Sequence, residues 1–380
     1  MKTIPNLKTK ILAAAVLSSV ASMQAAPFLA IGDGAELFVT GVVGIRADDN
    51  IFQSTDAGLP AGAKSQVVSD TIFEITPGLD LTFGKNSLLK GSLAVTDSFT
   101  NYADTSGINT NLFGADLRSS FDDGKLKLDG SAGYHELNQN SADIRGLTRR
   151  DVTNFAGKGE VLISEKTSVG AGLTFERTNY KRASYTDQDM LTVPLNAYYK
   201  ITPKVDLSLG YRYRDTQVQK GSDSQDNYFN VGARGEFTPK LTGHFSIGYN
   251  KRSLTVGKDE DQLGFDADLA YELTPKTNLS FGASNDFSTS AAGQQQKNFS
   301  LNGRVSTKIS EVWSYSAGLS YRASDYTTRT DDYLDGNLGV TYVINSYVGV
   351  TGTYNYRSNS SPLAASEFTN NVFSLAANIR

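Results

Sequence analysis

The sequence contains no cysteine, only two histidines and a single tryptophan, Trp313. Without cysteine there is no disulfide framework and no thiolate to ligate zinc. The two histidines, His135 and His244, are predicted to lie at opposite ends of their strands, which disfavours a Ser-His-Asp site. No glycine-rich phosphate loop occurs either. These absences predict a protein that is not an enzyme, with no catalytic residues, no metal and no cofactor.

Long apolar runs are also missing. After residue 25 there is no stretch of about 18 apolar residues, so the sequence predicts no membrane helix. Residues 1–25 combine early lysines, an apolar segment and the small pair Ala25-Ala26, the pattern of a cleaved signal peptide. We therefore predict two parts: a signal peptide at 1–25, and one outer-membrane β-barrel at 26–380.

Positive charge is in deficit. The whole chain has 36 basic and 40 acidic residues, and removal of Lys2, Lys8 and Lys10 with the signal peptide leaves 33 − 40 = −7. A nucleic-acid partner calls for a basic stripe, which is not seen, so no such partner is expected. The mean hydropathy of −0.31 fits a barrel whose polar and apolar faces average out.

A repeat is the most informative feature that is present. Thr-Pro-Lys occurs three times, with the prolines at Pro203, Pro239 and Pro275, spaced 36 and 36 residues apart. Proline cannot donate to a β-ladder and presets a turn dihedral, so each triplet is predicted at the tip of a hairpin. A fixed period filled with alternating residues indicates one hairpin repeated in tandem.

Each predicted strand has one apolar face and one polar face. From Val205 to Asp215, one face carries valine, leucines and tyrosines, and the other carries charged and small residues. Eighteen such strands of about 12–15 residues are expected, the first at 36–47 and the last at 367–380, which suits tilted membrane strands. Short and long connections alternate between them, as in outer-membrane barrels. The fold class is therefore all-β: a single transmembrane antiparallel meander β-barrel of about 18 strands, with both termini at the tight-turn end.

Strand periodicity also predicts which side chains face lipid. The apolar set is expected outside and the polar set inside. The residues predicted to face lipid are Leu207, Leu209, Phe229, Val231, Leu269, Leu279 and Phe281, and those predicted to face the lumen include Ser280. Aromatic residues near the strand ends are expected to form interfacial belts, with ordinary cross-strand pairing as the alternative: Tyr180, Tyr211, Tyr213, Tyr249, Tyr321, Tyr354 and Tyr356 toward the long loops, and Tyr199, Phe237, Tyr271 and Tyr342 near the tight turns.

The charged residues of the polar face are the candidate functional residues. Opposed basic and acidic sectors could sort solutes by charge, whereas the alternative is a solvated wall with scattered ion pairs. The candidate lumen-lining residues are Asp206, Arg212, Arg214, Arg234, Glu236, Asp266, Asp268, Glu272, Arg304 and Lys308. No long loop is expected to fold into the lumen, although the link at about 48–68 is the longest.

These patterns carry a resemblance to a known family. The first strand is followed by Asp48-Asp49-Asn50-Ile51-Phe52, and the hairpins take the form seen from Tyr198 through Thr202-Pro203-Lys204 to Tyr213. They resemble the outer-membrane proteins called β-barrel porin 2. Some similar barrels accompany exopolysaccharide secretion, which implies polymer export as a possible role. One departure is the end of the chain, Ala377-Asn378-Ile379-Arg380, which lacks the terminal aromatic residue of many such barrels.

The function favoured by the sequence is a porin-like outer-membrane channel for passive passage of small hydrophilic solutes. The first alternative is a pore for exopolysaccharide export, in which lumen residues Tyr198, Tyr228 and Tyr333 would stack on sugar rings. The second is a structural or surface barrel that transports nothing. The expected location is the outer membrane, and the expected partners are its lipid, the barrel-assembly machinery and, for the export alternative, polysaccharide.

Overall fold

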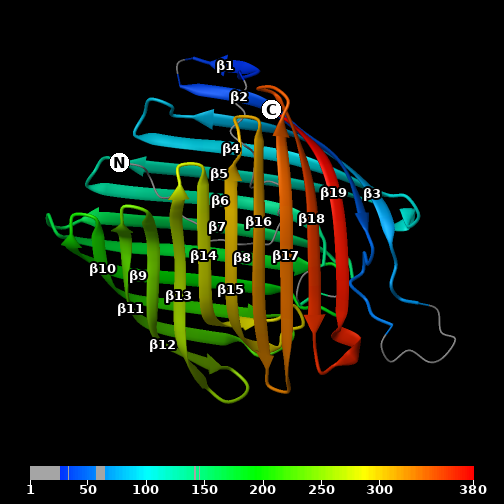
Figure 1. Cartoon of the computed structure of the whole chain (residues 1–380). Helices are drawn as coiled ribbons and strands as arrows, with labels where there is room; N and C mark the ends of the chain where they lie inside the picture. Colours follow the sequence, from blue (N-terminus) through cyan, green and yellow to red (C-terminus); the bar gives the residue numbers. More distant parts are fainter. Residues whose placement is uncertain (1–25, 33, 57–64, 141–142, 145) are drawn as a thin grey trace.

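The computed structural model describes residues 26–32, 34–56, 65–140, 143–144 and 146–380, and these form one antiparallel β-barrel (Figure 1). Each strand pairs with the next along the chain, and β19 returns to pair with β2, so the eighteen strands β2–β19 close on themselves. The strands are β1 (Leu29–Ile31), β2 (Ala35–Asp48), β3 (Asp70–Phe83), β4 (Leu89–Tyr102), β5 (Thr110–Asp122), β6 (Leu126–Asn138), β7 (Arg149–Leu162), β8 (Thr167–Tyr180), β9 (Gln188–Thr202), β10 (Val205–Val218), β11 (Ser224–Thr238), β12 (Leu241–Leu254), β13 (Glu260–Thr274), β14 (Thr277–Thr289), β15 (Gln295–Lys308), β16 (Trp313–Tyr326), β17 (Arg329–Val343), β18 (Val348–Ser360) and β19 (Phe368–Ile379).

The predicted fold class is confirmed. The barrel is a closed meander of eighteen strands, and most strand ends lie within two residues of the predicted ones, such as 205–218 for β10. The sequence did not predict β1. Helical structure in the described residues is limited to two 3₁₀ turns, η1 (Ser106–Ile108) and η2 (Ala364–Ser366). No helix in this part of the chain is long and apolar enough to cross a membrane. The proposed signal peptide at 1–25 lies outside the described residues.

The strands are tilted, so opposite walls of the barrel cross each other. In Figure 1 the strands β13–β19 run across the front, and β4–β12 run behind them at a steep angle. This crossing follows from barrel closure, because a closed sheet must tilt its strands relative to the barrel axis. The tight turns lie toward the top and left of the view, with β1 and the C-terminus at the top, and the longer loops lie toward the bottom and right.

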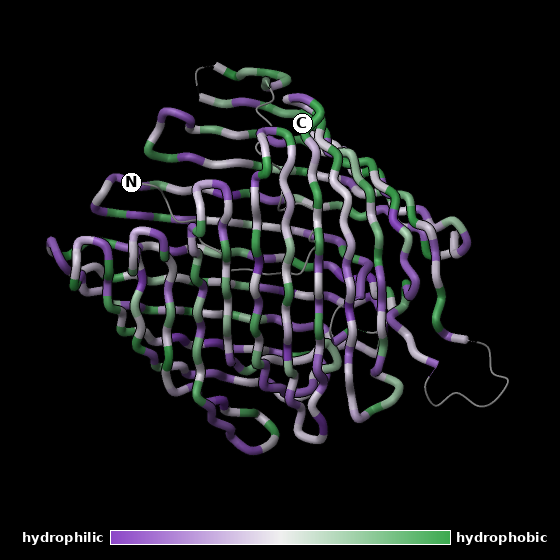
Figure 2. Tube along the Cα trace, viewed as in Figure 1, coloured by the Kyte–Doolittle hydropathy of each residue, from purple (hydrophilic) through white to green (hydrophobic). Residues whose placement is uncertain are grey.

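Alternation along each strand divides the side chains between an outer and an inner face, and Figure 2 shows the alternating hydropathy along the tube. Leu209 and Phe229 point outward, with 65% and 58% of their surfaces exposed in the isolated barrel. Arg234, on the opposite face of β11, instead contacts Glu160 of β7 across the interior. One belt assignment is wrong. Tyr180 lies on the inner face of β8 with the buried Ser168, because Val169 and Leu173 set the outward phase of this strand.

Single-cysteine variants test which side chains face the lumen, because the natural sequence contains no cysteine. We expect Ser208→Cys, on the inner face of β10, to react with a charged, membrane-impermeant thiol reagent in reconstituted vesicles. Leu209→Cys should be protected, because its side chain would lie against lipid. The reverse labelling pattern would mean that the strand is inverted.

The tight turns hold themselves together locally. In each Thr-Pro-Lys turn the threonine hydroxyl accepts backbone N–H groups that follow it: Thr202 Oγ1 lies 3.0 Å from the Val205 nitrogen, and Thr238 Oγ1 lies 3.0 Å from the Leu241 nitrogen. Another tight turn uses a carboxylate. The backbone N–H groups of Leu126 and Lys125 donate to Asp123, and they hold the pKa of that carboxyl below its usual value.

The closing seam between β19 and β2 is shorter than the neighbouring pairings. It joins residues 372–379 to residues 41–48, so the first residues of β2 extend beyond β19. The short strand β1 pairs with this overhang, Leu29 opposite Leu37 and Ile31 opposite Ala35. Arg380 reaches across the seam, with its guanidinium 4.6 Å from the centre of the Phe38 ring and 3.2 Å from Asp80 Oδ2 of β3. The edge that β19 leaves uncovered is therefore occupied.

Candidate functional site

The candidate lumen residues fall into groups, and the first lies toward the tight-turn end. Arg234 of β11 donates to Glu160 of β7 at 2.6 and 2.8 Å and to Asp206 of β10 at 3.1 Å. Its guanidinium also lies over Tyr198 of β9, 3.3 Å from the ring centre. We call Arg234, Asp206, Glu160 and Tyr198 the Arg234 cluster. Side chains from strands as far apart as β7 and β11 therefore meet here in the interior.

A second group lies toward the long-loop end. Arg214 of β10 donates to Asp226 of β11 and Asp286 of β14, at 2.7 and 3.1 Å. Arg252 of β12 donates to the same Asp226 at 2.6 and 2.8 Å, and both partners are almost completely buried. Arg212 of β10 adds a 2.8 Å contact to Asp286. We call these five residues the Arg214 cluster. Its charges are paired and hydrogen-bonded, which is the condition for burying them.

The third group is one that the sequence reasoning missed. His244 of β12 lies 2.8 Å from Asp266 and 3.8 Å from Asp268, both on β13. Their donor atoms all lie within 4.8 Å of one another, and among the described residues this is the one such group of His, Asp and Glu side chains that could hold a metal ion. A signal was available, because alternation places His244, Asp266 and Asp268 on the polar face of consecutive strands, and the structure pairs His244 directly opposite Asp268. We predicted no metal, and the arrangement offers a nitrogen and two carboxylates to a cation.

The remaining candidates are Glu236, Glu272, Arg304 and Lys308. Glu236 forms an ion pair with Lys204 beside its tight turn. Glu272 and Lys308 are exposed near the tight-turn ends of β13 and β15, and Arg304 is half-buried on β15. The candidate residues are thus distributed over the length of the barrel, and they do not form one ring.

The tyrosines proposed to stack on sugar rings are packed against arginines. Tyr198 and Tyr228 are buried, and arginine guanidinium groups already cover their rings, Arg234 on Tyr198 and Arg212 on Tyr228 at 4.9 Å. Tyr333 is covered in the same way by Arg322, at 5.0 Å. This packing disfavours the stacking that the export alternative requires, and alternation alone could not reveal it, because alternation places a side chain on a face but does not say which neighbour packs on it.

Two loops at the long-loop end fold inward, contrary to our expectation that none would. One is the β2–β3 link, in which Ile51 is buried against Ile72 and Tyr102 of the barrel wall. The other is the β6–β7 link, in which Asn140 Nδ2 donates to the Ile51 carbonyl at 2.8 Å and the Gly146 nitrogen donates to the Phe52 carbonyl at 3.1 Å. We call the described residues of 49–56 and 139–148 the plug.

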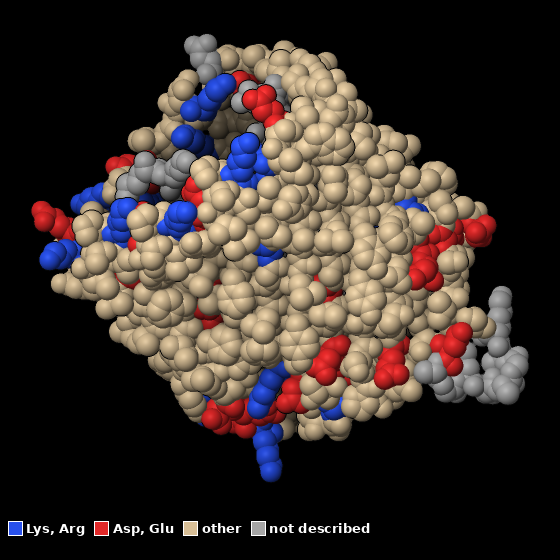
Figure 3. Space-filling view, viewed as in Figure 1, with Lys and Arg blue, Asp and Glu red and all other residues tan. Residues whose placement is uncertain are grey.

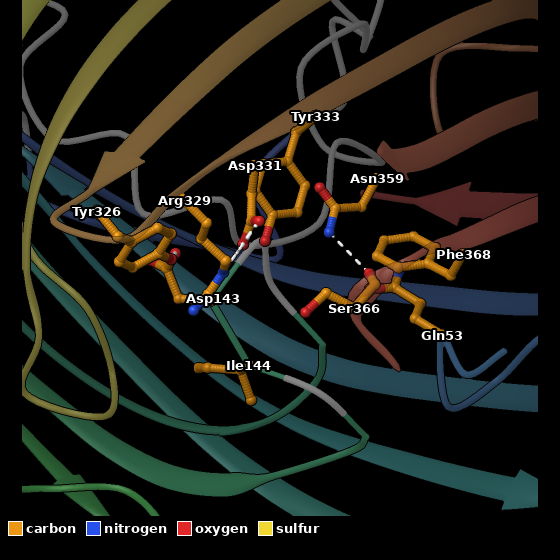
Figure 4. A pocket seen from close by; sticks show the side chains of 10 residues that line it. All are labelled: Gln53, Asp143, Ile144, Tyr326, Arg329, Asp331, Tyr333, Asn359, Ser366 and Phe368. Carbon is orange, nitrogen blue, oxygen red and sulfur yellow. Dashed lines mark hydrogen bonds and ion pairs between the residues drawn. The ribbon is translucent and has the colours of Figure 1, made fainter. Parts of the chain in front are cut away.

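The plug reaches the opposite wall. Asp143 of the β6–β7 link contacts Tyr326 Oη at 3.1 Å, Gln296 Nε2 at 3.4 Å and Arg322 Nη2 at 3.6 Å. Tyr326 belongs to β16, which is 16 − 7 = 9 strands from β7 in an eighteen-stranded barrel, halfway round it. The plug residues Gln53, Asp143 and Ile144 also border a cavity of about 40 Å³ against β16–β19 (Figure 4).

Three further loops meet at the long-loop end of the barrel. The Thr186 nitrogen of the β8–β9 link donates to the Ala291 carbonyl of the β14–β15 link at 2.9 Å. Gly293 lies so close to the Lys220 carbonyl that a Cβ there would come within 2.4 Å of it, and its φ of +78° also favours glycine. The β8–β9, β10–β11 and β14–β15 links therefore narrow the same mouth.

The two ends of the barrel differ in burial. At the long-loop ends of the strands the inner face carries fully buried polar side chains: Asp70, Asp226, Asn250, Arg252, Asp331 and Asn370. At the tight-turn ends the inner face carries exposed ones: Lys127, Asp129, Lys158, Asn278, Ser280 and Lys308. Figure 3 shows a hollow at the tight-turn end with both signs of charge around it. The lumen is open to solvent at one end and packed with polar groups at the other.

A closed barrel with a polar, charged interior and an apolar outer face is the architecture of an outer-membrane pore. Residues 93–380 match the family model described as "Putative beta-barrel porin 2". The chain belongs to the β-barrel porin 2 family. The resemblance drawn from the hairpins is thereby confirmed. Family and fold indicate an outer-membrane porin in contact with lipid, and a channel rather than an enzyme.

Solved structures with a similar fold include porins from Pseudomonas. Pseudomonas aeruginosa OpdQ is 10% identical, covering 91% of this chain and 97% of that one, with a TM-score of 0.47. Pseudomonas aeruginosa OccK2 (OpdF) in complex with glucuronate is 9% identical, covering 91% and 98%, with a TM-score of 0.49. A BenF-like porin from Pseudomonas fluorescens Pf-5 is 9% identical, covering 92% and 99%, with a TM-score of 0.48. A search of curated proteins found no match to the sequence.

Proposed function

We propose that residues 26–380 form a channel for passive passage of small hydrophilic solutes across the outer membrane. Residues 1–25 would direct export and be cleaved, and the barrel-assembly machinery would insert the barrel. The observation that carries the proposal is the polar inner face. Placing an Arg or Lys against lipid at the midplane would cost about 2–4 kcal/mol each, so these side chains belong in an aqueous or paired interior. The polar packing of the plug makes the long-loop mouth the narrow part of the path.

The Arg234 and Arg214 clusters supply the charge that would select among solutes. Replacing Arg212, Arg214 and Arg234 together with serine removes three positive charges from the inner face and leaves Asp206, Glu160 and Asp286 without these partners. In planar bilayers under a KCl gradient, the wild-type barrel should conduct, and the triple variant should shift its reversal potential toward cation preference.

A matched control removes the same charge from outside the lumen. Arg149 and Arg177 lie on the outer face of β7 and β8, and Lys181 follows β8, each paired with a nearby carboxylate. Their triple replacement with serine should leave the reversal potential nearly unchanged. Equal shifts of the reversal potential in the two triple variants would show that the lumen arginines do not determine ion selectivity. A wild-type barrel without conductance would refute the channel.

A further inference from the structure

Asp143 of the plug lies where three hydrogen-bond donors of the opposite wall converge. Gln296 lies directly opposite Tyr326 on the paired strands β15 and β16, and Arg322 lies on the same inner face of β16. All three aim a donor at the Asp143 carboxylate. An amide, a phenol and a guanidinium around one carboxylate make a recognition site for that group, here filled by a residue of the chain itself.

The contacts to Asp143 are long. They measure 3.1, 3.4 and 3.6 Å, whereas charge-assisted hydrogen bonds to a carboxylate are commonly about 2.7–2.9 Å. The same β-barrel makes tighter ones, since Arg234 approaches Glu160 to 2.6 Å. The site therefore holds its internal carboxylate loosely, and an external carboxylate could approach more closely.

Unsatisfied polar atoms surround the same place. Arg322 Nε and Nη2 are buried without a hydrogen-bond partner, although Asp143 provides charge to Nη2 at 3.6 Å. Gln296 Oε1 and Ser324 Oγ are also buried without partners, and both residues are more than nine-tenths buried. Such groups are costly to leave unpaired, and a ligand that hydrogen-bonds to them would relieve that cost.

Space and charge agree with a small anion. A cavity of about 40 Å³ borders Asp143 and Tyr326, with room for about three waters at ~10–15 Å³ each (Figure 4). Gln296 and Arg322 do not line this cavity, so a bound carboxylate would take the place of the Asp143 carboxylate, and the cavity would receive the displaced side chain. Arg329 is paired with Asp331 at 3.1 Å, so these two charges cancel. If Asp143 withdraws, Arg322 leaves the group with a net charge of +1.

We propose that Gln296, Arg322 and Tyr326 bind the carboxylate of small solutes, and that Asp143 is an internal competitor which such a solute displaces. This inference rests on the proposed function, because it names small carboxylates as the solute class of that channel. Displacement would release the plug from the β15–β16 wall at the narrow mouth. The apparent affinity is then reduced by the fraction of time that Asp143 fills the site.

The test is ligand-observed NMR with ¹³C-labelled acetate and acetamide, on the full barrel refolded in micelles. Wild type should bind acetate saturably and acetamide at least about tenfold more weakly, since hydrogen bonds between a charged donor and a carboxylate are worth roughly that factor or more. Asp143→Asn should tighten acetate binding by weakening the competitor. Arg322→Gln should weaken it by about tenfold or more.

Arg357→Gln is the matched control, because Arg357 is an inner-face arginine paired with Asp335 at 2.9 Å, and it should leave acetate binding unchanged. The proposed site is refuted if acetate and acetamide bind equally well, or if Arg322→Gln leaves acetate binding unchanged. Conductance in KCl separates the two proposals. A barrel that conducts but does not bind acetate would support the channel and refute the carboxylate site. Acetate binding that depends on Arg322, in a barrel without conductance, would support the site and refute the channel.

Discussion

Replacing residues 139–148 with Asn-Gly should raise the single-channel conductance several-fold. Asn138 and Arg149 are directly opposite each other at the ends of β6 and β7, so a two-residue turn can join them without shifting the register. The replacement removes Asp143 from the β15–β16 wall and Asn140 from the β2–β3 link, which are the contacts that carry the plug across the mouth. Planar-bilayer recordings in KCl measure the effect.

A deletion in another loop at the same end serves as control. Residues 256–258 of the β12–β13 link are exposed, and Val256 donates to Ser222 of the β10–β11 link at 2.9 Å rather than to the plug, so their removal should change conductance far less than loss of residues 139–148. If both deletions raise conductance equally, loop length alone governs it. If neither does, the narrow part of the path lies elsewhere, within the Arg234 or Arg214 cluster.

Asp226→Ala should destabilise the barrel by about 3–5 kcal/mol, the usual cost of leaving a buried charge without its partner. Asp226 is completely buried and accepts hydrogen bonds from both Arg214 and Arg252. After the substitution Arg252 loses its carboxylate partner while its side chain remains buried. Urea unfolding of the barrel in lipid vesicles gives the free-energy change.

The control substitution is Asp189→Ala. Asp189 pairs with Arg177 on the outer face at 2.6 Å, and 34% of the Asp189 side chain and 50% of the Arg177 side chain are exposed. Exposed pairs contribute little, because water already solvates the charges. A comparable loss of stability in the two variants would show that the Arg214 cluster is not an energetic centre of the interior.

The fold could be predicted because its determinants are local. The alternation from Val205 to Asp215 and the turn chemistry of Thr202 and Thr238 act within a few residues, so the strands and tight turns follow from nearby sequence. The inner or outer face of a side chain also follows from alternation. Tyr180 was misplaced because its aromatic character was weighed above the phase set by Val169 and Leu173.

The functional arrangement could not be predicted as fully, because it depends on contacts between distant segments. Asp143 and Tyr326 are 183 residues apart, and no spacing rule joins a loop to the wall on the far side of a barrel. One signal was available and unused. Ile51, Phe52, Ile144 and Leu147 are large apolar residues in loops, where burial is favoured for such side chains, and all four are buried or partly buried here.

The short seam has a consequence for the order of assembly. Every other pairing in the barrel forms between neighbours in the chain, but 41–48 must find 372–379 across the whole sequence, so closure is expected to be the last and slowest step. Until then the chain is a curled open sheet with two bare edges, the state in which one copy could pair with another instead of with itself. β1 shields part of one edge. Arg380 can reach Asp80 only after the two edges have paired, so this contact would form late and would slow separation of β19 from β2.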